Sequence, residues 1–99
     1  MPLRAQSKVV AKLLVKEACV EDYLTLAGEM VEQAKNDAGM VYYTVNRSND
    51  NPRLFAVLEC WENSEALQAH LETEQFKAMA PLIGPMIEQS FPAEFYTEI

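Results

Sequence analysis

Apolar residues recur along the chain with two different periods, and the change of period separates strands from helices. From Val9 to Val15 every odd position is apolar while Lys12 interrupts the even ones, which is the alternation expected of a strand. Residues 19–39 instead space their apolar side chains three and four positions apart, which predicts an amphipathic helix. Gly39, just past the helix, suits the left-handed conformation that commonly closes one.

The middle of the chain has the pattern of a hairpin followed by helices. Residues 40–47 and 53–61 are rich in β-branched and aromatic side chains, and the turn formers SNDNP lie between them. Asn63 and Thr73 each precede a helical segment, where a side-chain oxygen can accept a backbone N–H of the first turn. The pattern therefore predicts two antiparallel strands and then two short helices.

The C-terminal part is interrupted by proline. Pro81 and Pro85 lack the N–H that a helix interior requires, so residues 77–89 are expected to form two short turns. A last strand is expected over residues 93–97. The chain then reads β-α-β-β-α-β, the order of a ferredoxin-like α+β fold with an antiparallel sheet and helices on one face.

A single domain is expected over residues 1–99, with its core at 9–98, because 99 residues are too few for two separate cores. The sheet face away from the helices also looks apolar, since consecutive residues such as Val57 and Leu58 point to opposite sides of their strand. Apolar surface left in water costs about 25 cal/mol per Å². We therefore expect a homodimer joined sheet to sheet, and a cover made by loops or by the N-terminal arm is the alternative.

Composition narrows the class of partner. Eight basic against fifteen acidic residues give a formal net charge of -7, which repels nucleic-acid phosphates and anionic membranes. No apolar run has the length of a signal-peptide core or of a membrane span. Cys19, Cys60 and the single histidine lack the spacing of a metal site, so we expect no bound metal and reduced thiols. The chain is expected to be cytoplasmic and to bind neither nucleic acid nor membrane.

The candidate chemistry is concentrated in residues 58–76, which contain the chain's only tryptophan and its only histidine. His70 borders the apolar stripe of its predicted helix, where an imidazole can accept a proton from a bound phenol or enol at neutral pH. A packed, hydrogen-bonded histidine is the simpler explanation of the same position. Trp61 ends its strand on the same side as Glu59, where it offers either a flat wall for an aromatic ligand or a core side chain.

Other polar residues have two interpretations each. Glu59 points to an apolar face and needs hydrogen bonds or solvent, so it either orients a base or pairs with Lys12 or Arg47. Tyr42 and Tyr43 point to opposite sides of their strand, so one phenol reaches a pocket on either face, although packing also favours tyrosine in strands. No phosphate-binding glycine loop or dinucleotide fingerprint is present, so a flavin or nicotinamide bound through a familiar motif is not supported.

Residues 59–62 read E-x-W-E, residues 65–71 read E-A-L-x-A-H-L, and Phe76 follows. Together with the glycine-closed helix before them, these motifs resemble the antibiotic biosynthesis monooxygenase family, from roughly residue 9 to the end of the chain. The resemblance implies a dimeric α+β barrel. It implies no single reaction, because members include quinol and anthrone oxygenases, haem-degrading enzymes and isomerase-like relatives.

The chain also departs from this family at informative positions. The second histidine that many members carry immediately before the phenylalanine is Gln75 here. The haem-ligating histidine and the first-strand asparagine of the haem-degrading members correspond to Ala80 and Ala11. Without an axial ligand the haem iron has no anchor, so haem degradation is disfavoured.

The resemblance implies a cofactor-independent monooxygenase that oxidises a small quinol-like or polycyclic aromatic substrate with dioxygen, because the deprotonated substrate itself donates an electron to oxygen. It implies His70 as the catalytic base, Tyr43 and Glu59 as catalytic polar groups that orient the ring, and Trp61 and Phe76 as substrate-binding walls. Two alternatives remain: a non-catalytic ligand-binding or interaction module on the same dimeric barrel, and an isomerase of a labile lactone or sugar phosphate. The small number of basic residues argues against a strongly phosphorylated substrate.

Overall fold

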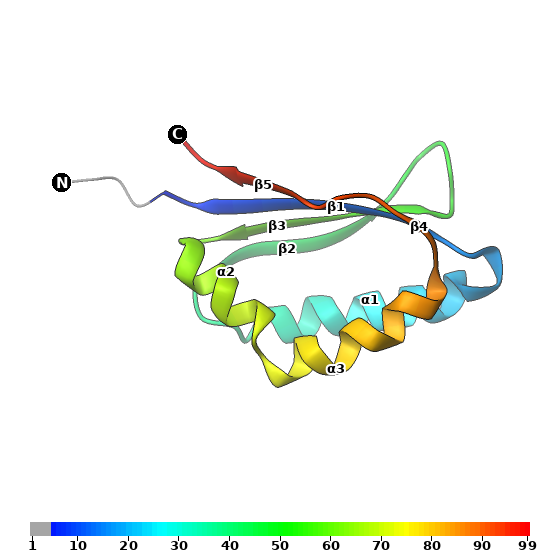
Figure 1. Cartoon of the computed structure of the whole chain (residues 1–99), viewed down its shortest axis with the longest axis horizontal. Coiled ribbons are helices and arrows are strands. Elements are labelled where there is room, and N and C mark those ends of the chain that lie inside the picture. Colours follow the sequence, from blue (N-terminus) through cyan, green and yellow to red (C-terminus); the bar gives the residue numbers. More distant parts are fainter. Residues whose placement is uncertain (1–4) are drawn as a thin grey trace.

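A computed structural model describes residues 5–99 of the chain. Over this range the protein forms two layers, a five-stranded antiparallel sheet and three α-helices that lie against one of its faces (Figure 1). In chain order the elements are β1 (Ser7–Val15), a 3₁₀ turn (Glu17–Cys19), α1 (Val20–Ala34), β2 (Met40–Arg47), β3 (Leu54–Trp61), α2 (Ser64–Leu71), α3 (Glu74–Ile83), a second 3₁₀ turn (Gly84–Met86), β4 (Ile87–Ser90) and β5 (Glu94–Thr97). The predicted α+β ferredoxin-like fold is confirmed.

The sheet is built around β1. Its strand order is β2-β3-β1, and the two C-terminal strands both pair with the remaining edge of β1. β5 takes the first half of that edge, where Ser7 lies opposite Thr97, and β4 takes the last part, where Val15 lies opposite Ile87. The register of β1 with β3 brings the odd-numbered residues of both strands onto one face, and the helices cover that face.

The core lies between this sheet face and α1. Its largest fully buried side chains are Trp61, Tyr23, Phe55 and Val15. The Tyr23 ring of α1 packs on the Phe55 ring of β3, with the two ring centroids 4.8 Å apart. This contact holds the helix layer in a fixed position over the sheet.

Both predicted helix caps are confirmed. Asn63 Oδ1 accepts the backbone N–H of Ala66 at 2.9 Å, and Thr73 Oγ1 accepts that of Phe76 at 3.2 Å. These bonds fix where α2 and α3 begin, and therefore which of their side chains face the sheet. Within residues 5–99, the helices do not combine the length and the apolar character that crossing a bilayer requires.

The prediction of two short turns over residues 77–89 is wrong in its first half. α3 continues through Pro81 and ends at Ile83. Pro81 is exposed and lies in the last turn, so the helix loses one backbone hydrogen bond there while the buried Met79 holds it against the core. Pro85 does lie in a separate 3₁₀ turn, as expected.

The predicted last strand is present, and a further strand precedes it. β5 covers most of the expected range 93–97, whereas β4 is an additional strand that the apolar pattern does not predict. Pro92 lies between them and has no N–H to donate to β1, so it does not extend the ladder. The chain therefore pairs with the edge of β1 twice, over four residues each time.

The second face of the sheet carries no helix within residues 5–99 (Figure 1). Val10, Leu14 and Leu58 are half-buried on this open face, and Tyr42 and Tyr96 are 40% and 52% exposed. The single chain therefore presents an apolar surface to water on this side. The sheet-to-sheet homodimer remains a prediction.

Candidate functional site

The loop between α1 and β2 is held against the start of α2. Gly39 adopts φ +80°, and a Cβ atom at this position would lie 2.6 Å from the Cβ of Ala66. The backbone N–H of Glu62 donates to the Gly39 carbonyl at 2.7 Å. Glycine is therefore required at this turn for its conformation and for the close approach. The turn brings Asp37 to His70, which is 33 residues further along the chain.

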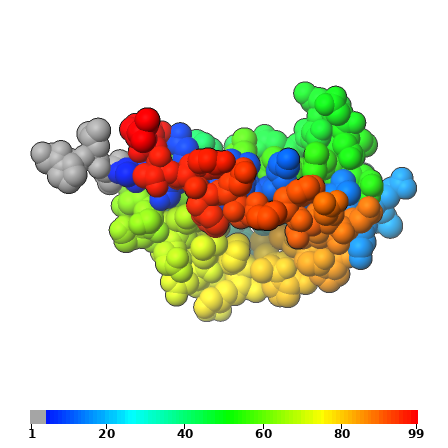
Figure 2. All heavy atoms as spheres, turned by 45° about the horizontal axis from the view of Figure 1, so that its top comes forward, coloured from blue at the N-terminus to red at the C-terminus, as the bar shows by residue number. Residues whose placement is uncertain are grey.

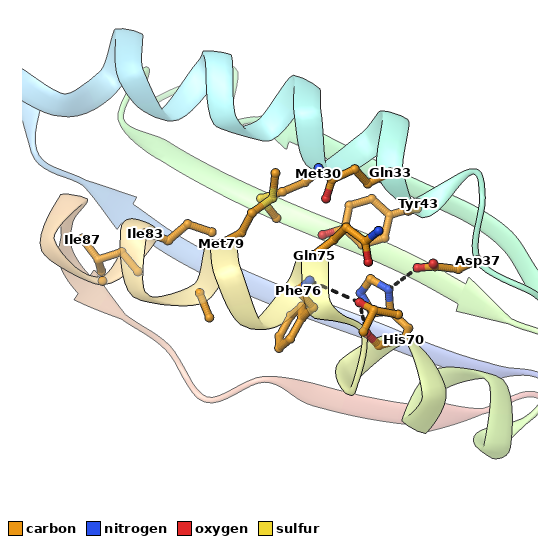
Figure 3. Close-up of a pocket in the computed structure, with 14 residues that line it drawn as sticks. Met30, Gln33, Asp37, Tyr43, His70, Gln75, Phe76, Met79, Ile83 and Ile87 are labelled. Carbon is orange, nitrogen blue, oxygen red and sulfur yellow. Dashed lines mark hydrogen bonds and ion pairs between the residues drawn. The ribbon is translucent and has the colours of Figure 1, made fainter.

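Asp37 and His70 form a buried pair. The Nδ1 atom of His70 lies 2.6 Å from Oδ2 of Asp37 (Figure 3), and the two side chains are 9% and 20% exposed. A carboxylate can only accept at this contact, so Nδ1 carries the proton and neutral His70 presents Nε2 as an acceptor. This is the arrangement in which a carboxylate orients a histidine base.

Three aromatic rings surround the His70 imidazole. The ring centroid of Trp61 lies 4.5 Å from that of His70, and those of Phe76 and Tyr43 lie at 5.4 and 5.7 Å. Trp61 is fully buried, and its Nε1–H donates to Oε1 of Glu59 at 3.0 Å. The imidazole is therefore held by a ring contact on one side and by Asp37 on the other.

A cavity of about 250 Å³ opens between α1 and α3, and His70 lies at one end of it (Figure 3). Its walls are mostly apolar, and apart from Tyr43 of β2 its polar members come from the ends of the helices and the adjoining turns. The lining residues are Met30, Gln33, Ala34, Asp37, Tyr43, His70, Thr73, Gln75, Phe76, Met79, Ala80, Ile83, Gly84 and Ile87. The pair therefore faces a space that suits a flat apolar molecule with a polar group.

Burial changes the acid–base properties of two neighbouring groups. Burial raises the pKa of Tyr43 well above its ordinary value of 10.0, and the negative charges of Glu59 and Asp37 raise it further. Burial also raises the pKa of Glu59, against the opposing effect of the hydrogen bond from Trp61. Tyr43 therefore keeps its proton at neutral pH and can donate a hydrogen bond into this cavity.

The predicted site residues separate into two groups. His70, Tyr43 and Phe76 line the same cavity, whereas Trp61 lies behind His70 and does not line it. Glu59 lines a neighbouring cavity beneath α3. Trp61 thus supports the imidazole, and the aromatic wall of the first cavity is formed by Phe76 and Tyr43.

The alternative pairing of Glu59 with Lys12 or Arg47 is wrong. The Lys12 ammonium lies over the ring of Phe91, 5.2 Å from its centroid. The Arg47 Nε–H donates to the Pro52 carbonyl at 2.9 Å. Even-numbered Lys12 points to the open face of the sheet, away from Glu59, so the register of β1 with β3 separates the two charges.

Sequence reasoning missed Asp37 entirely. Its signal is weak, because a carboxylate two residues before a helix-closing glycine is also a common turn residue. Gln33, Met30 and Met79 were also missed, since they reach the cavity only because α1 and α3 lie side by side. The usable signal is that a histidine base needs a carboxylate partner, and Asp37 is the acidic residue of the loop between α1 and β2.

A family comparison agrees with the fold and extends over most of the chain. The family model described as antibiotic biosynthesis monooxygenase matches residues 7–82. Among curated proteins, no sequence is similar enough to count as a match.

Solved structures include close matches to the whole fold. A candidate antibiotic biosynthesis monooxygenase from Caulobacter crescentus CB15 is 26% identical, with a TM-score of 0.91 over 98% of this chain and 92% of that chain. A conserved protein from Methanosarcina mazei Go1 is 26% identical, with a TM-score of 0.89 over 94% of this chain and 92% of that one. A conserved protein of unknown function from Bacteroides thetaiotaomicron VPI-5482, 22% identical, shares the fold with a TM-score of 0.87 over 96% and 99% of the two chains.

Proposed function

The chain belongs to the antibiotic biosynthesis monooxygenase family, and from this premise we propose that it is a cofactor-independent monooxygenase that oxidises a quinol-like or polycyclic aromatic substrate with dioxygen. The observation that carries the proposal is the Asp37–His70 pair at the end of an apolar cavity. A phenol is the substrate group that such a base can activate at neutral pH.

The first step is a proton transfer. The phenolic hydroxyl of the substrate gives its proton to Nε2 of His70, and Asp37 stabilises the imidazolium that forms. Tyr43, which keeps its own proton, donates a hydrogen bond to an oxygen of the bound ring. The apolar walls exclude water from the resulting phenolate and hold its ring in place.

The second step is an electron transfer that requires no other reductant. The phenolate gives one electron to dioxygen, which leaves an aryloxyl radical and superoxide, and these two combine through a new carbon–oxygen bond. The ring-bound peroxide takes back the proton from His70, its oxygen–oxygen bond breaks, and water leaves with the hydrogen of that ring carbon. One oxygen atom enters the ring as a carbonyl and the other becomes water, so a 1,4-diol yields a hydroxyquinone.

We propose a homodimer through the open sheet face as the assembly that supports this site. The half-buried Leu14, Leu54 and Leu58 and the exposed Tyr42 and Tyr96 form an apolar surface there. A second copy covers it by two-fold symmetry and so removes apolar area from water. Sedimentation equilibrium over a wide concentration range tests this assembly, and a single chain at all concentrations contradicts it.

Oxygen uptake tests the activity. A panel of one-, two- and three-ring hydroquinones and anthrones is supplied to the purified protein in a dioxygen electrode. His70→Ala should lower the rate by about 100-fold or more, because a positioned general base contributes about 10²–10⁴-fold. Asp37→Asn should lower the rate by up to about 10⁴-fold, the effect of the same change in a Ser-His-Asp triad, and should shift the pH profile of the rate.

A matched variant distinguishes the loss of the Asp37–His70 pair from the loss of one negative charge. Asp50→Asn removes the same charge from the exposed hairpin loop and should leave the rate unchanged. Equal rates with and without protein for every substrate would remove the proposal. Thermal stabilisation by the same compounds without oxygen uptake would favour a ligand-binding module instead.

A further inference from the structure

The His70 ring needs more than one contact to hold it in a fixed orientation, and Asp37 supplies the first. The Nδ1 atom of His70 is held 2.6 Å from Oδ2 of Asp37, which fixes one point of the imidazole. A single hydrogen bond leaves the ring free to turn about that point, because the torsion that sets the plane of a histidine ring has only a broad preference of its own. The direction in which Nε2 faces therefore depends on what packs against the ring.

Trp61 is the side chain that sets this plane. The Trp61 and His70 rings are tilted by only 32°, with their centroids 4.5 Å apart, which is close to an offset stack. The rings of Tyr43 and Phe76 are steeper, at 56° and 59° to the imidazole, and their centroids lie further away, at 5.7 and 5.4 Å. Trp61 is also fully buried, so the core holds it in place. Of the three rings, Trp61 thus gives the imidazole its flattest and most rigid support.

The orientation of the Trp61 ring depends in turn on Glu59. Both residues belong to β3 and are two positions apart, so their side chains point to the same face of the sheet. The indole has one polar atom, Nε1, and its N–H donates to Oε1 of Glu59 at 3.0 Å. A buried N–H without an acceptor costs free energy, so turning the indole over about its torsion is unfavourable. Glu59 therefore selects the ring orientation that supports His70.

Glu59 itself lies outside the space in which the substrate would bind. It is 9% exposed and does not line the first cavity. It lines the neighbouring cavity beneath α3, on the side where the surface is hollowed between α3 and the segment that joins β4 to β5 (Figure 2). Within residues 5–99, Trp61 is the only side chain that forms a hydrogen bond with this carboxyl group, and no basic side chain forms an ion pair with it. Glu59 therefore reaches the candidate base only through Trp61.

We propose that Glu59 is a positioning residue for the base: through Trp61 it fixes the plane of the His70 imidazole and so directs Nε2 into the first cavity. This role differs from the one that the family resemblance implies, in which Glu59 orients the ring of the substrate. A carboxyl group accepts a hydrogen bond in either protonation state, so the role requires an acceptor oxygen and not a charge. The inference rests on the proposed function for the reaction at His70, but the position of the imidazole can be measured without turnover.

Two substitutions at residue 59 separate the acceptor oxygen from the charge. Glu59→Gln keeps an acceptor for Trp61, whereas Glu59→Leu removes it and leaves a side chain of similar size. His70 and Trp61 are the only histidine and the only tryptophan, so nuclear magnetic resonance of their ring nitrogens reports on each residue without overlap. In the ligand-free protein, Glu59→Leu should shift the indole N–H signal and both imidazole ¹⁵N signals. Glu59→Gln should leave the imidazole signals as they are in wild type.

The same two variants should separate kcat from KM in the oxygen-uptake assay. Glu59→Leu should lower kcat by up to about 100-fold, the cost of misplacing a reacting group by about 1 Å. Its KM should stay unchanged, because the walls of the first cavity are intact. Glu59→Gln should keep both constants of wild type.

Phe55→Leu is the matched control for loss of stability. Phe55 belongs to the same strand and is 1% exposed, but it does not line the first cavity and packs on Tyr23 instead of His70. This variant should lower Tm, because a smaller side chain leaves a gap in the core. It should leave the imidazole signals, kcat and KM unchanged, which a merely structural effect of Glu59→Leu would also do.

A double-mutant cycle tests the route through Trp61. Trp61→Phe keeps a ring beside His70 but has no N–H for Glu59 to accept. If Glu59 acts only through that N–H, adding Glu59→Leu to Trp61→Phe should cause no further change in the imidazole signals or in kcat. Thermal melting of the two single variants and of the double variant should show a cooperative transition for each.

Three results would overturn the positioning role. They are imidazole signals that Glu59→Leu leaves unchanged, a Glu59→Gln variant that behaves as Glu59→Leu does, and additive effects of the two substitutions in the cycle. Imidazole signals that follow the expected pattern, with no oxygen uptake from any quinol, would keep the positioning role and remove the proposed oxidation. Oxygen uptake with unchanged imidazole signals in every Glu59 variant would remove the positioning role and keep the oxidation.

Discussion

Val57 and Leu58 are neighbours on β3, yet Val57 is 5% exposed beneath the helices whereas Leu58 is half-buried on the open face. The covered face holds its polar groups through specific buried partners, as Asp37 holds His70. The open face holds Lys8 through an ion pair with Glu98, in which both side chains are at least one-third exposed. The covered face therefore carries the candidate site, whereas the open face carries the surface through which we propose that two copies associate.

The largest expected effect comes from placing a charge on each face in turn. Val57→Asp should cost about 4 kcal/mol or more, because an unpaired carboxylate is buried beneath the helices. A domain of this size has a stability of about 5–15 kcal/mol, so Val57→Asp should lower the denaturant midpoint strongly when unfolding is followed by circular dichroism. Leu58→Asp should remain folded and shift the proposed dimer to a monomer in sedimentation equilibrium.

The adjacent positions make each variant the control for the other, since both introduce the same group into the same strand. Unfolding of Leu58→Asp would show that the open face is part of the monomer core. A dimer that survives Leu58→Asp would place the association elsewhere on the chain. Either result would break the distinction between the two faces.

The second expected effect concerns the turn that positions the site on the covered face. Gly39→Ala should destabilise the protein by about 1–2 kcal/mol from backbone strain alone, and the clash with Ala66 adds to this loss. Gly28 offers the matched control, because it lies within α1 with open space around its Cα. Gly28→Ala should stabilise the helix by about 1 kcal/mol. Denaturant unfolding at one fixed protein concentration measures both changes.

An equal loss of unfolding free energy in both glycine variants would contradict this explanation. The left-handed turn at Gly39 and the helix propensity at Gly28 would then not determine the effects of the two substitutions. If the turn at Gly39 positions the Asp37–His70 pair, Gly39→Ala should also lower the rate of oxygen uptake. Gly28→Ala should leave this rate unchanged. This result would connect the backbone conformation of one residue to the chemistry of the cavity.

The fold was predictable where the signal is local. Period-two and helical spacings, the caps at Asn63 and Thr73 and the glycine at residue 39 each depend on a few neighbouring residues. The path through Pro81 and the additional strand β4 depend on tertiary packing against α1 and β1, which no local pattern contains. The conformation of these two segments is therefore determined by tertiary contacts.

The candidate site was predictable only in part for the same reason. His70, Tyr43 and Phe76 come from one contiguous motif or from a strand with a clear facing rule, and all three line the first cavity. Asp37 becomes part of the site only through a close turn that brings it to His70, a residue far along the chain. Trp61 was expected to form a wall of the pocket, but it packs against the imidazole and does not line the first cavity.

The smallest expected effect is a change in how stability depends on pH. Because burial raises the pKa of Glu59 above its ordinary value of 4.5, the folded state holds this proton more tightly than the unfolded state does. The stabilisation is fully present below the ordinary pKa and is lost as pH rises through the raised one. Glu59→Gln keeps the acceptor oxygen for Trp61 and cannot ionise, so it should gain stability relative to wild type as pH rises from 4.5 towards neutrality.

Glu29→Gln supplies the baseline for this comparison, because it removes the same charge from the exposed side of α1. The quantity to measure is the difference in unfolding free energy between each variant and wild type across the pH range, at one protein concentration. A difference for Glu59→Gln that does not grow with pH would mean that this carboxyl is solvated in the folded protein. The contrast between the two faces would then rest on Asp37 and His70 alone.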